Sequence, residues 1–302
     1  MSRRVLVLTA LTGLLGTTPG AHAQTSPRDR LLVSTAWLAE HLDDANLVLL
    51  HVGERAEYDA GHIAGARFVA MQDVSSPRQD GALSLQLPAI EELLPKLEAL
   101  GISDDSRIVL YWGKDHVTPT TRIAFTLDWA GLGDDLSILN GGMPQWHREG
   151  RALTTDAPAV KTARLTPRRP KDSVVSVDWV LEHVTAPKAG VTLIDARAPA
   201  FYEGAQVSQG VNGHIPGAAN IPFTELATAE VHIADFTKLR ALFEAAGAKP
   251  GDTIVTYCHI GQQATATLFA ARLLGYDVRL FDGSMNEWAR DRARPLTTGA
   301  GR

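Results

Sequence analysis

Residues 253–265 read TIVTYCHIGQQAT and place Cys258, the one cysteine of the chain, directly after a short apolar run. The run Thr253–Tyr257 is typical of a strand that is buried on both faces of a parallel sheet. Gly261 allows a tight turn, and residues 266–274 contain good helix formers. The order of strand, tight loop and helix predicts an α/β domain with Cys258 at the carboxyl end of a strand.

The same short segments occur in the same order in both halves of the chain. In the first half they read LVLL at 47–50, GHIAGA at 61–66, RIVLY at 107–111 and NGGMPQW at 140–146. In the second half they read VTLID at 191–195, GHIPGA at 213–218, TIVTY at 253–257 and FDGSMNEW at 281–288. Self-similarity over this length predicts two copies of one domain.

Each half alternates short apolar runs with segments of helical spacing, such as residues 90–100 and 236–246. This alternation predicts an α/β fold in which each domain is a mostly parallel sheet flanked by helices. We expect the domains to span residues 31–155 and 174–298. Three prolines and several basic residues lie in 156–173. We interpret this segment as a solvated interdomain linker rather than as a binding patch.

Composition and charge narrow the class of protein. Of the 302 residues, 45% are hydrophobic and 21% are charged, which is ordinary for a globular protein with room for two domains. The formal net charge is −5. An acidic chain lacks the basic surface that nucleic-acid binding needs, so we do not expect a nucleic-acid partner.

The N-terminal segment differs in character from the rest. Arg3 and Arg4 precede an apolar run at 5–15, and AHA at 21–23 provides small residues around a cleavage point. This pattern is typical of a signal peptide over residues 1–23, which predicts a periplasmic or secreted protein. The apolar run is too short for a membrane span, so we do not expect a permanent anchor. An uncleaved anchor and a chance apolar stretch are the alternatives, and the two arginines do not decide between Sec and twin-arginine export.

A chain with one cysteine cannot form an internal disulfide, so Cys258 is either a buried core residue or free for chemistry. Features that both halves share are expected to maintain the fold, which makes His62 and His214 of the repeated GHI segments packing or turn residues. The halves differ directly after the strand that ends in tyrosine. The second half has Cys258 at this position, and the first half has Trp112. We interpret the first domain as inactive and Trp112 as a core or interface aromatic residue.

A second difference lies at the end of an earlier strand, where DAR at 195–197 stands opposite HVG at 51–53. Ligand sites gather at the carboxyl ends of parallel strands. Arg197 is therefore a candidate for binding an anionic substrate with its paired donors. The alternative, which the sequence leaves open, is an ion pair of Arg197 with Asp195 or with the other domain.

Cys258 is expected at the N-terminus of a helix, where unpaired backbone N–H groups and the helix dipole stabilise an anion. We expect the pKa of the thiol to fall, and the surrounding amides to stabilise a negatively charged persulfide without a metal or cofactor. The residues after the cysteine are candidates for binding substrate, and His259, Gln262 and Gln263 could also donate a proton, with solvated loop residues as the alternative. These candidates are His259, Ile260, Gly261, Gln262, Gln263 and Ala264.

The chain resembles the tandem-domain rhodanese family, which includes thiosulfate and 3-mercaptopyruvate sulfurtransferases. The resemblance rests on the two related halves, the GHIPG segment, the loop YCHIGQQAT and the closing GxxxxW segment, and it covers residues 31–298. It implies an exported bacterial-type member with an inactive first domain, a cleft between the domains, Cys258 as nucleophile and Arg197 as a ligand of substrate anions. The loop matches neither the basic loop of thiosulfate-preferring members nor the small neutral loop of mercaptopyruvate-preferring members. Residues 199–202 also lack a second expected arginine.

The resemblance implies a two-step sulfurtransferase without a cofactor. Cys258 takes sulfur from a small donor, thiosulfate being favoured over 3-mercaptopyruvate, and passes it to a thiophilic acceptor such as cyanide, a small thiol or a protein cysteine. The alternative function is a non-turnover sulfur carrier, or a module that binds a sulfur compound and serves one exported partner. A cysteine phosphatase is disfavoured, because Ala264 occupies the position of the arginine that such a loop needs.

Overall fold

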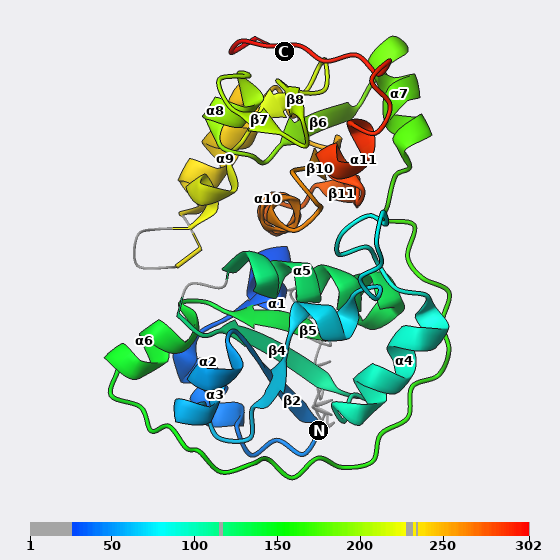
Figure 1. Ribbon diagram of the computed structural model, residues 1–302. Helices are drawn as coiled ribbons and strands as arrows, with labels where there is room; N and C mark the ends of the chain where they lie inside the picture. The colour runs from blue at the N-terminus through cyan, green and yellow to red at the C-terminus, as the bar shows by residue number, and fades with distance from the viewer. Residues whose placement is uncertain (1–25, 115–116, 228–231, 234, 302) are drawn as a thin grey trace, which may run out of the picture.

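The computed structural model describes residues 26–114, 117–227, 232–233 and 235–301. The chain forms two α/β units that lie one above the other in Figure 1, with helices α5 (Val117–Leu127) and α10 (Gln263–Leu273) between the two sheets. The predicted signal peptide at 1–23 lies outside the described residues. Among the described helices, none is long and apolar enough to cross a membrane.

The first unit is built on a sheet of five parallel strands. From edge to edge these are β1 (Leu32–Val33), β5 (Leu136–Leu139), β4 (Arg107–Trp112), β2 (Leu47–Val52) and β3 (Arg67–Val69). Besides α5, its helices and helical turns are α1 (Pro27–Leu31), α2 (Thr35–His41), α3 (Arg55–Ala60), η1 (Met71–Val74), α4 (Ile90–Ala99), η2 (Asp128–Leu132) and α6 (Gly142–Arg148). The core lies on both faces of the sheet, with α1, α4 and α5 on one face and α2 and α6 on the other.

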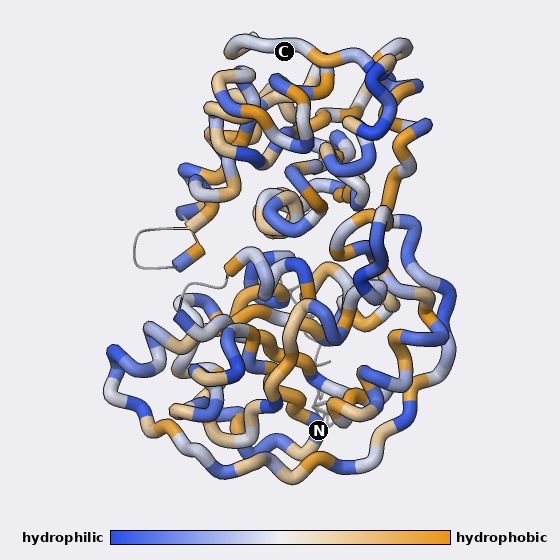
Figure 2. The backbone as a smooth tube through the Cα atoms, viewed as in Figure 1, coloured by the Kyte–Doolittle hydropathy of each residue, from blue (hydrophilic) through white to orange (hydrophobic). Residues whose placement is uncertain are grey.

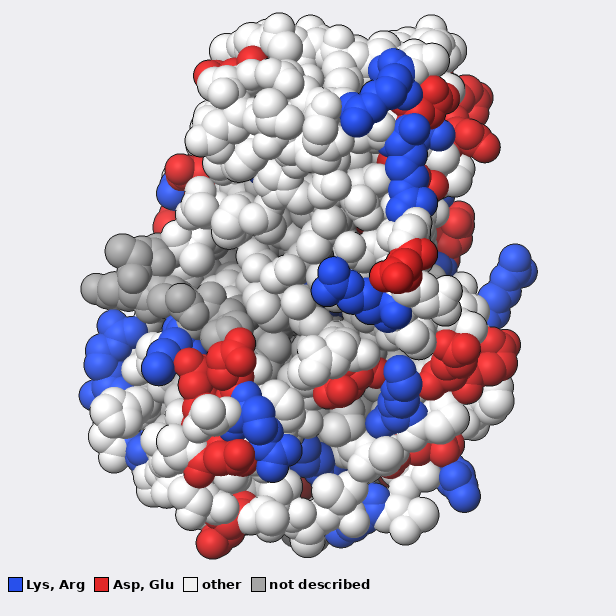
Figure 3. Space-filling model, viewed as in Figure 1, with Lys and Arg blue, Asp and Glu red and all other residues white. Residues whose placement is uncertain are grey.

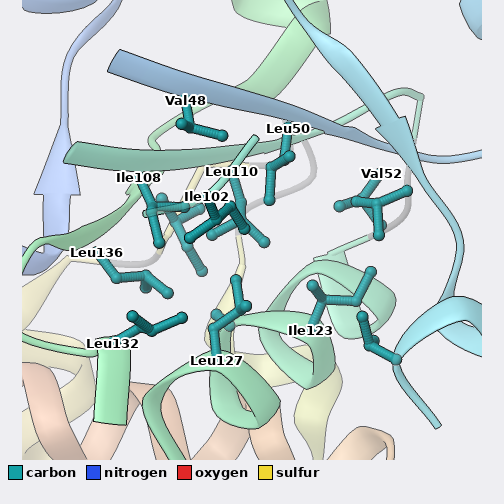
Figure 4. Packing of buried hydrophobic residues seen from close by; sticks show 14 of the residues in the cluster. Val48, Leu50, Val52, Ile102, Ile108, Leu110, Ile123, Leu127, Leu132 and Leu136 are labelled. Carbon is teal, nitrogen blue, oxygen red and sulfur yellow. The ribbon is translucent and has the colours of Figure 1, made fainter. Parts of the chain in front are cut away.

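Close packing of aliphatic side chains fills the layer between this sheet and α5. Figure 4 shows Val48, Leu50 and Val52 of β2 on one side of the layer and Ile123 and Leu127 of α5 on the other. The central strands are hydrophobic along most of their length in Figure 2, as expected for strands that are covered on both faces.

The second unit repeats this plan with a four-stranded parallel sheet. The strand order is β11 (Asp277–Leu280), β10 (Thr253–Tyr257), β6 (Val191–Asp195) and β9 (Ala219–Asn220). Besides α10, the remaining elements are α7 (Val177–Thr185), α8 (Pro199–Tyr202), η3 (Phe223–Leu226), α9 (Phe236–Ala245), α11 (Ser284–Trp288) and an antiparallel hairpin of β7 (Val207–Ser208) and β8 (Val211–Asn212). The predicted α/β fold is therefore confirmed in both halves.

The histidines of the two GHI segments make the same contacts in each unit. His62 stacks on Tyr58 with ring centroids 3.8 Å apart, and His214 stacks on Tyr202 at 3.6 Å. Each imidazole also places Nδ1 within 2.8 Å of the carbonyl oxygen of its tyrosine, and both rings are buried. Their shared role is packing, as the comparison of the halves predicts.

The segment between the units runs along the outside of the first unit (Figure 1). Three of its basic side chains pair with acidic residues there: Arg164 with Glu98 at 3.0 Å, Arg168 with Asp104 at 2.8 Å and Lys171 with Asp128 at 2.8 Å. On the face shown in Figure 3, basic side chains likewise lie among acidic ones. These pairs fit a linker that is held against the first unit better than a basic binding patch.

A buried arginine joins the two units at the interface of α5 and α10. Arg122 of α5 has no exposed side-chain surface, and its Nη1 lies 2.5 Å from Asp282 Oδ1 of the second unit. The same nitrogen donates to the carbonyl oxygen of Gly261 at 3.3 Å, and Nη2 donates to the carbonyl oxygen of Leu85. The backbone N–H of Leu87 donates to the other oxygen of Asp282 at 3.0 Å. The first unit therefore supplies the donors that neutralise a carboxylate of the second.

Trp112 is fully buried in the first unit, and a glycine makes room for it. Gly142, at the start of α6, has φ +53°, and a Cβ atom there would lie 2.4 Å from Trp112 Nε1. Counting back from Trp146 and Trp288, the equivalent residue of the second unit is Ser284, which has a similar φ of +50°. The two units thus share a left-handed backbone position but differ in the side chain that it can carry.

We expect Arg122→Met to lower the free energy of unfolding by about 3 to 5 kcal/mol, because it leaves the Asp282 carboxylate buried without its cation. The matched control is Arg168→Met, which breaks a half-exposed pair with Asp104 and should cost less than about 1 kcal/mol. Urea unfolding of both variants measures the difference. Equal losses would show that the buried pair does not hold the units together.

We expect Gly142→Ser to destabilise the protein by about 1 to 3 kcal/mol more than Gly150→Ser. Both glycines have a positive φ, but a Cβ at Gly150 meets nothing within 4 Å, whereas one at Gly142 overlaps Trp112. The backbone cost is therefore common to both variants, and the difference isolates the steric conflict with the indole. Thermal or urea unfolding checks this, and similar stabilities of the two variants would contradict it.

Candidate active site

The loop between β10 and α10 surrounds the sulfur of Cys258. The strand ends at Tyr257 and the helix begins at Gln263, so the loop has five residues. Four backbone amides donate hydrogen bonds toward the thiol, those of Ile260, Gly261, Gln263 and Ala264. This is the anion-binding arrangement that the sequence predicts for a sulfur at a helix start.

The pKa of the Cys258 thiol differs from the expectation. Burial raises it above its ordinary value, and the four amides that act in the opposite direction recover only part of this rise. The expected fall in pKa is therefore wrong. The physical reason is that the side chain has no exposed surface, and loss of hydration penalises the thiolate more than the amides stabilise it.

Gly261 has a role beyond that of an ordinary turn residue. Its φ is +83°, and a Cβ atom would lie 2.6 Å from the carbonyl oxygen of Asp282 and 3.1 Å from Arg122 Nη1. The loop passes so close to these groups that only glycine fits. With this conformation the Gly261 N–H points to the sulfur while its carbonyl accepts from Arg122.

Ser284 forms a hydrogen bond with the backbone of Cys258, and the sequence analysis did not identify it. Its Oγ accepts from the N–H of Cys258 at 3.1 Å and donates to the carbonyl oxygen of Phe281 at 2.9 Å. The N–H of Met285 donates to the carbonyl oxygen of Cys258 at 3.1 Å. The signal that could have revealed Ser284 is the difference between the closing segments, where Gly142 stands in the first half.

Arg197 is paired rather than free. Its Nε and Nη2 donate to the two oxygens of Asp195 at 3.0 and 2.6 Å, and Nη2 also donates to the carbonyl oxygen of Gly213 at 2.8 Å. Burial opposes the charge of this guanidinium, but the Asp195 carboxylate outweighs burial and raises its pKa, and the charge of Cys258 adds to the rise. No described residue pairs with its Nη1, but the guanidinium is almost fully buried.

His259 is held from two sides in the second unit. Its Nδ1 lies 2.6 Å from Ser208 Oγ, and its ring makes an edge contact with Phe201 at a centroid distance of 4.7 Å. Burial lowers the pKa of the imidazole, and the nearby charge of Arg197 lowers it further. His259 follows Cys258 in the chain, its side chain is partly exposed, and its surroundings favour the neutral imidazole.

The other candidate residues of the loop face different surroundings. Gln262 donates from Nε2 to Thr118 Oγ1 of the first unit at 3.1 Å, so its side chain spans the interface. Gln263 and Ala264 contribute through their backbone amides, and the Ala264 side chain is fully buried. Ile260 lines a cavity of about 560 Å³ whose other walls come from residues 72–85 of the first unit. Twelve of the thirteen residues that line the cavity thus belong to the first unit.

Comparison with known proteins agrees with this architecture. The family model described as a rhodanese-like domain matches twice, at residues 34–149 and 176–291. The chain is 35% identical to the protein named sulfur carrier protein TtuD of Thermus thermophilus, over 89% of this chain and 97% of that protein. It is 31% identical to the "Probable 3-mercaptopyruvate sulfurtransferase" of Pseudomonas aeruginosa, over 89% and 98%. It is 29% identical to the thiosulfate sulfurtransferase of Gallus gallus, over 86% and 93%.

Solved structures support the same fold. The structure titled as the anaerobic ergothioneine biosynthesis enzyme from Chlorobium limicola, in complex with trimethyl histidine, superposes with a TM-score of 0.77 at 24% identity. The match covers 89% of this chain and 70% of that chain. With a matched domain model in each half and relatives named as sulfurtransferases along most of its length, the chain belongs to the rhodanese family and carries two rhodanese-like domains in tandem.

Proposed function

We propose that the protein is a sulfurtransferase that moves sulfane sulfur from thiosulfate, or from 3-mercaptopyruvate, to a thiophilic acceptor through a persulfide on Cys258. The observation that carries this proposal is the position of the Cys258 sulfur within four backbone amides at the start of α10. Amides in this arrangement favour a sulfur-centred anion, whether thiolate or persulfide.

The reaction has two nucleophilic steps at sulfur. In the first, the Cys258 thiolate attacks the outer sulfur of thiosulfate, a new S–S bond forms, the S–S bond of thiosulfate breaks, and sulfite leaves with the electron pair. In the second, the acceptor attacks the outer sulfur of the persulfide, and Cys258 departs as a thiolate. The same amides stabilise the sulfur anion before and after each transfer.

Thiosulfate is the donor that we favour. Arg197 places a positive charge where it interacts with Cys258, which suits a compact dianion. Residues 199–202, where a second arginine is expected, form α8 and place Phe201 against His259 instead. A 3-mercaptopyruvate molecule carries a carboxylate and a keto group, and it would find fewer partners here. The relatives named for the two donors have similar identities, 29% and 31%, so identity alone does not select between them.

A sulfur carrier is the second candidate function. The relative with 35% identity is named a sulfur carrier protein, and Cys258 of this chain is fully buried, as suits sulfur that is held rather than turned over. We further propose that the protein acts in the periplasm or after secretion, on the basis of the signal-peptide pattern at 1–23. In that compartment the absence of a second cysteine prevents loss of the site to an internal disulfide.

Incubation with thiosulfate should increase the intact mass of the protein by one sulfur atom, and cyanide should remove it. Cys258→Ser should abolish both the mass increase and steady-state thiocyanate formation, because no other thiol exists in the chain. Mass spectrometry checks loading, and unfolding curves of the variant check that it is folded. A Cys258→Ser protein that still turns over contradicts the proposal, and loading without turnover favours the carrier.

The rate of persulfide formation should rise with pH by about tenfold per unit between about pH 6 and 8. Burial raises the pKa of the thiol, so the reactive thiolate is a minor species over this range and its fraction grows as protons are removed. Stopped-flow measurement of sulfite release in a single turnover gives the profile, and a far-ultraviolet spectrum at each pH serves as control for folding. A rate that does not change with pH over this range would mean that the amides lower the pKa of the thiol more than burial raises it.

A further inference from the structure

His259, the residue after Cys258, has surroundings that exist only in the second unit. The position of His259 is occupied by Gly113 in the first half, and the position of Phe201 by Glu57. His62 follows Tyr58 by four residues, whereas His214 follows Tyr202 by twelve. The additional residues form the β7–β8 hairpin, which brings Ser208 to the imidazole. The unit with the cysteine therefore has both the histidine and the elements that orient it.

The contacts of His259 fix one ring nitrogen and leave the other available. Nδ1 lies 2.6 Å from Ser208 Oγ, and Ser208 is itself buried. When Nδ1 carries the proton and donates to this oxygen, Nε2 has a free lone pair. Nε2 has no hydrogen-bond partner among the described residues, and the ring is partly exposed. The edge contact with Phe201 restricts rotation of the ring.

The charges around His259 favour its neutral form. Burial lowers the pKa of the imidazole, the positive charge of Arg197 lowers it further, and Asp195 opposes this to a smaller extent. Asp195 is already paired with Arg197, which limits its influence on the ring. A neutral imidazole can accept a proton near pH 7.

We propose that His259 is the general base that removes the proton of a thiol acceptor in the second half of the reaction, so that the natural acceptor is a thiol. This proposal rests on the persulfide function proposed above. The S–H proton of the acceptor moves to Nε2, and the resulting thiolate forms a bond with the outer sulfur of the persulfide. The bond from that sulfur to Cys258 breaks, and its electron pair returns to the Cys258 thiolate. The proton then passes from His259 to water, so no oxidant or reductant is consumed.

Two acceptors separate this role from a structural one. Dithiothreitol must lose a proton before it attacks, whereas sulfite at about pH 8 is already an anion and needs no base. The protein is first loaded with thiosulfate and freed of excess donor, and then mixed with either acceptor. Intact mass against time gives the rate at which the persulfide is discharged.

His259→Gln should lower the discharge rate with dithiothreitol by about 10²-fold and leave the rate with sulfite within about threefold. Ser208→Ala should shift the ratio of the two rates in the same direction by a smaller factor, because the ring loses the partner that sets its tautomer. The matched control is His147→Gln, which replaces an exposed histidine of the first unit and should leave both rates unchanged.

Equal losses with both acceptors in His259→Gln would overturn the proposal, because they would indicate a role in loop structure. An unchanged rate with dithiothreitol would overturn it as well. Failure of the parent protein to load, or to return sulfur to sulfite, would contradict the persulfide function itself, and this outcome is distinct from the two above.

Discussion

The orientation of the Gly261 peptide is the constraint on which the site depends. The Gly261 N–H faces the Cys258 sulfur, and the positive φ of this glycine accompanies a carbonyl that faces the interface between the units. A buried carbonyl without a donor is costly, and Arg122 of the first unit supplies that donor. The anion-binding loop of the second unit is thus completed by a side chain of the first. This gives the first unit a function although it lacks a thiol.

Full burial of the sulfur has two opposing consequences. It destabilises the thiolate relative to the thiol by removing water. It also strengthens each amide contact by lowering the local dielectric constant. In the function that we propose, the same enclosure would shield a persulfide on Cys258 from solvent. The cavity beside Ile260, two residues after the cysteine, is walled mainly by residues 72–85, a loop of the first unit.

The repeat in the sequence was sufficient to predict the α/β fold, the packing role of His62 and His214, and the loop that surrounds Cys258. The residues that it missed are partners from distant segments: Arg122 and Ser208 contact the loop only in the folded chain. The pair of Arg197 and Asp195 was foreseen as an alternative, because both residues lie within one short motif. The pKa of the thiol was predicted in the wrong direction, since the amides can be read from a strand, loop and helix pattern whereas the degree of burial cannot.

Trp112 with Gly142 in the first half, and Cys258 with Ser284 in the second, are pairs of residues whose substitutions depend on each other. In the second half the Ser284 hydroxyl accepts from the N–H of Cys258, and a cysteine at 112 would have only Gly142 at the equivalent position. A serine at 142 would in turn collide with the indole of Trp112. Building the arrangement around Cys258 into the first half would therefore take coordinated changes at 112 and 142. The difference between the two halves is in this respect maintained by the sizes of two side chains.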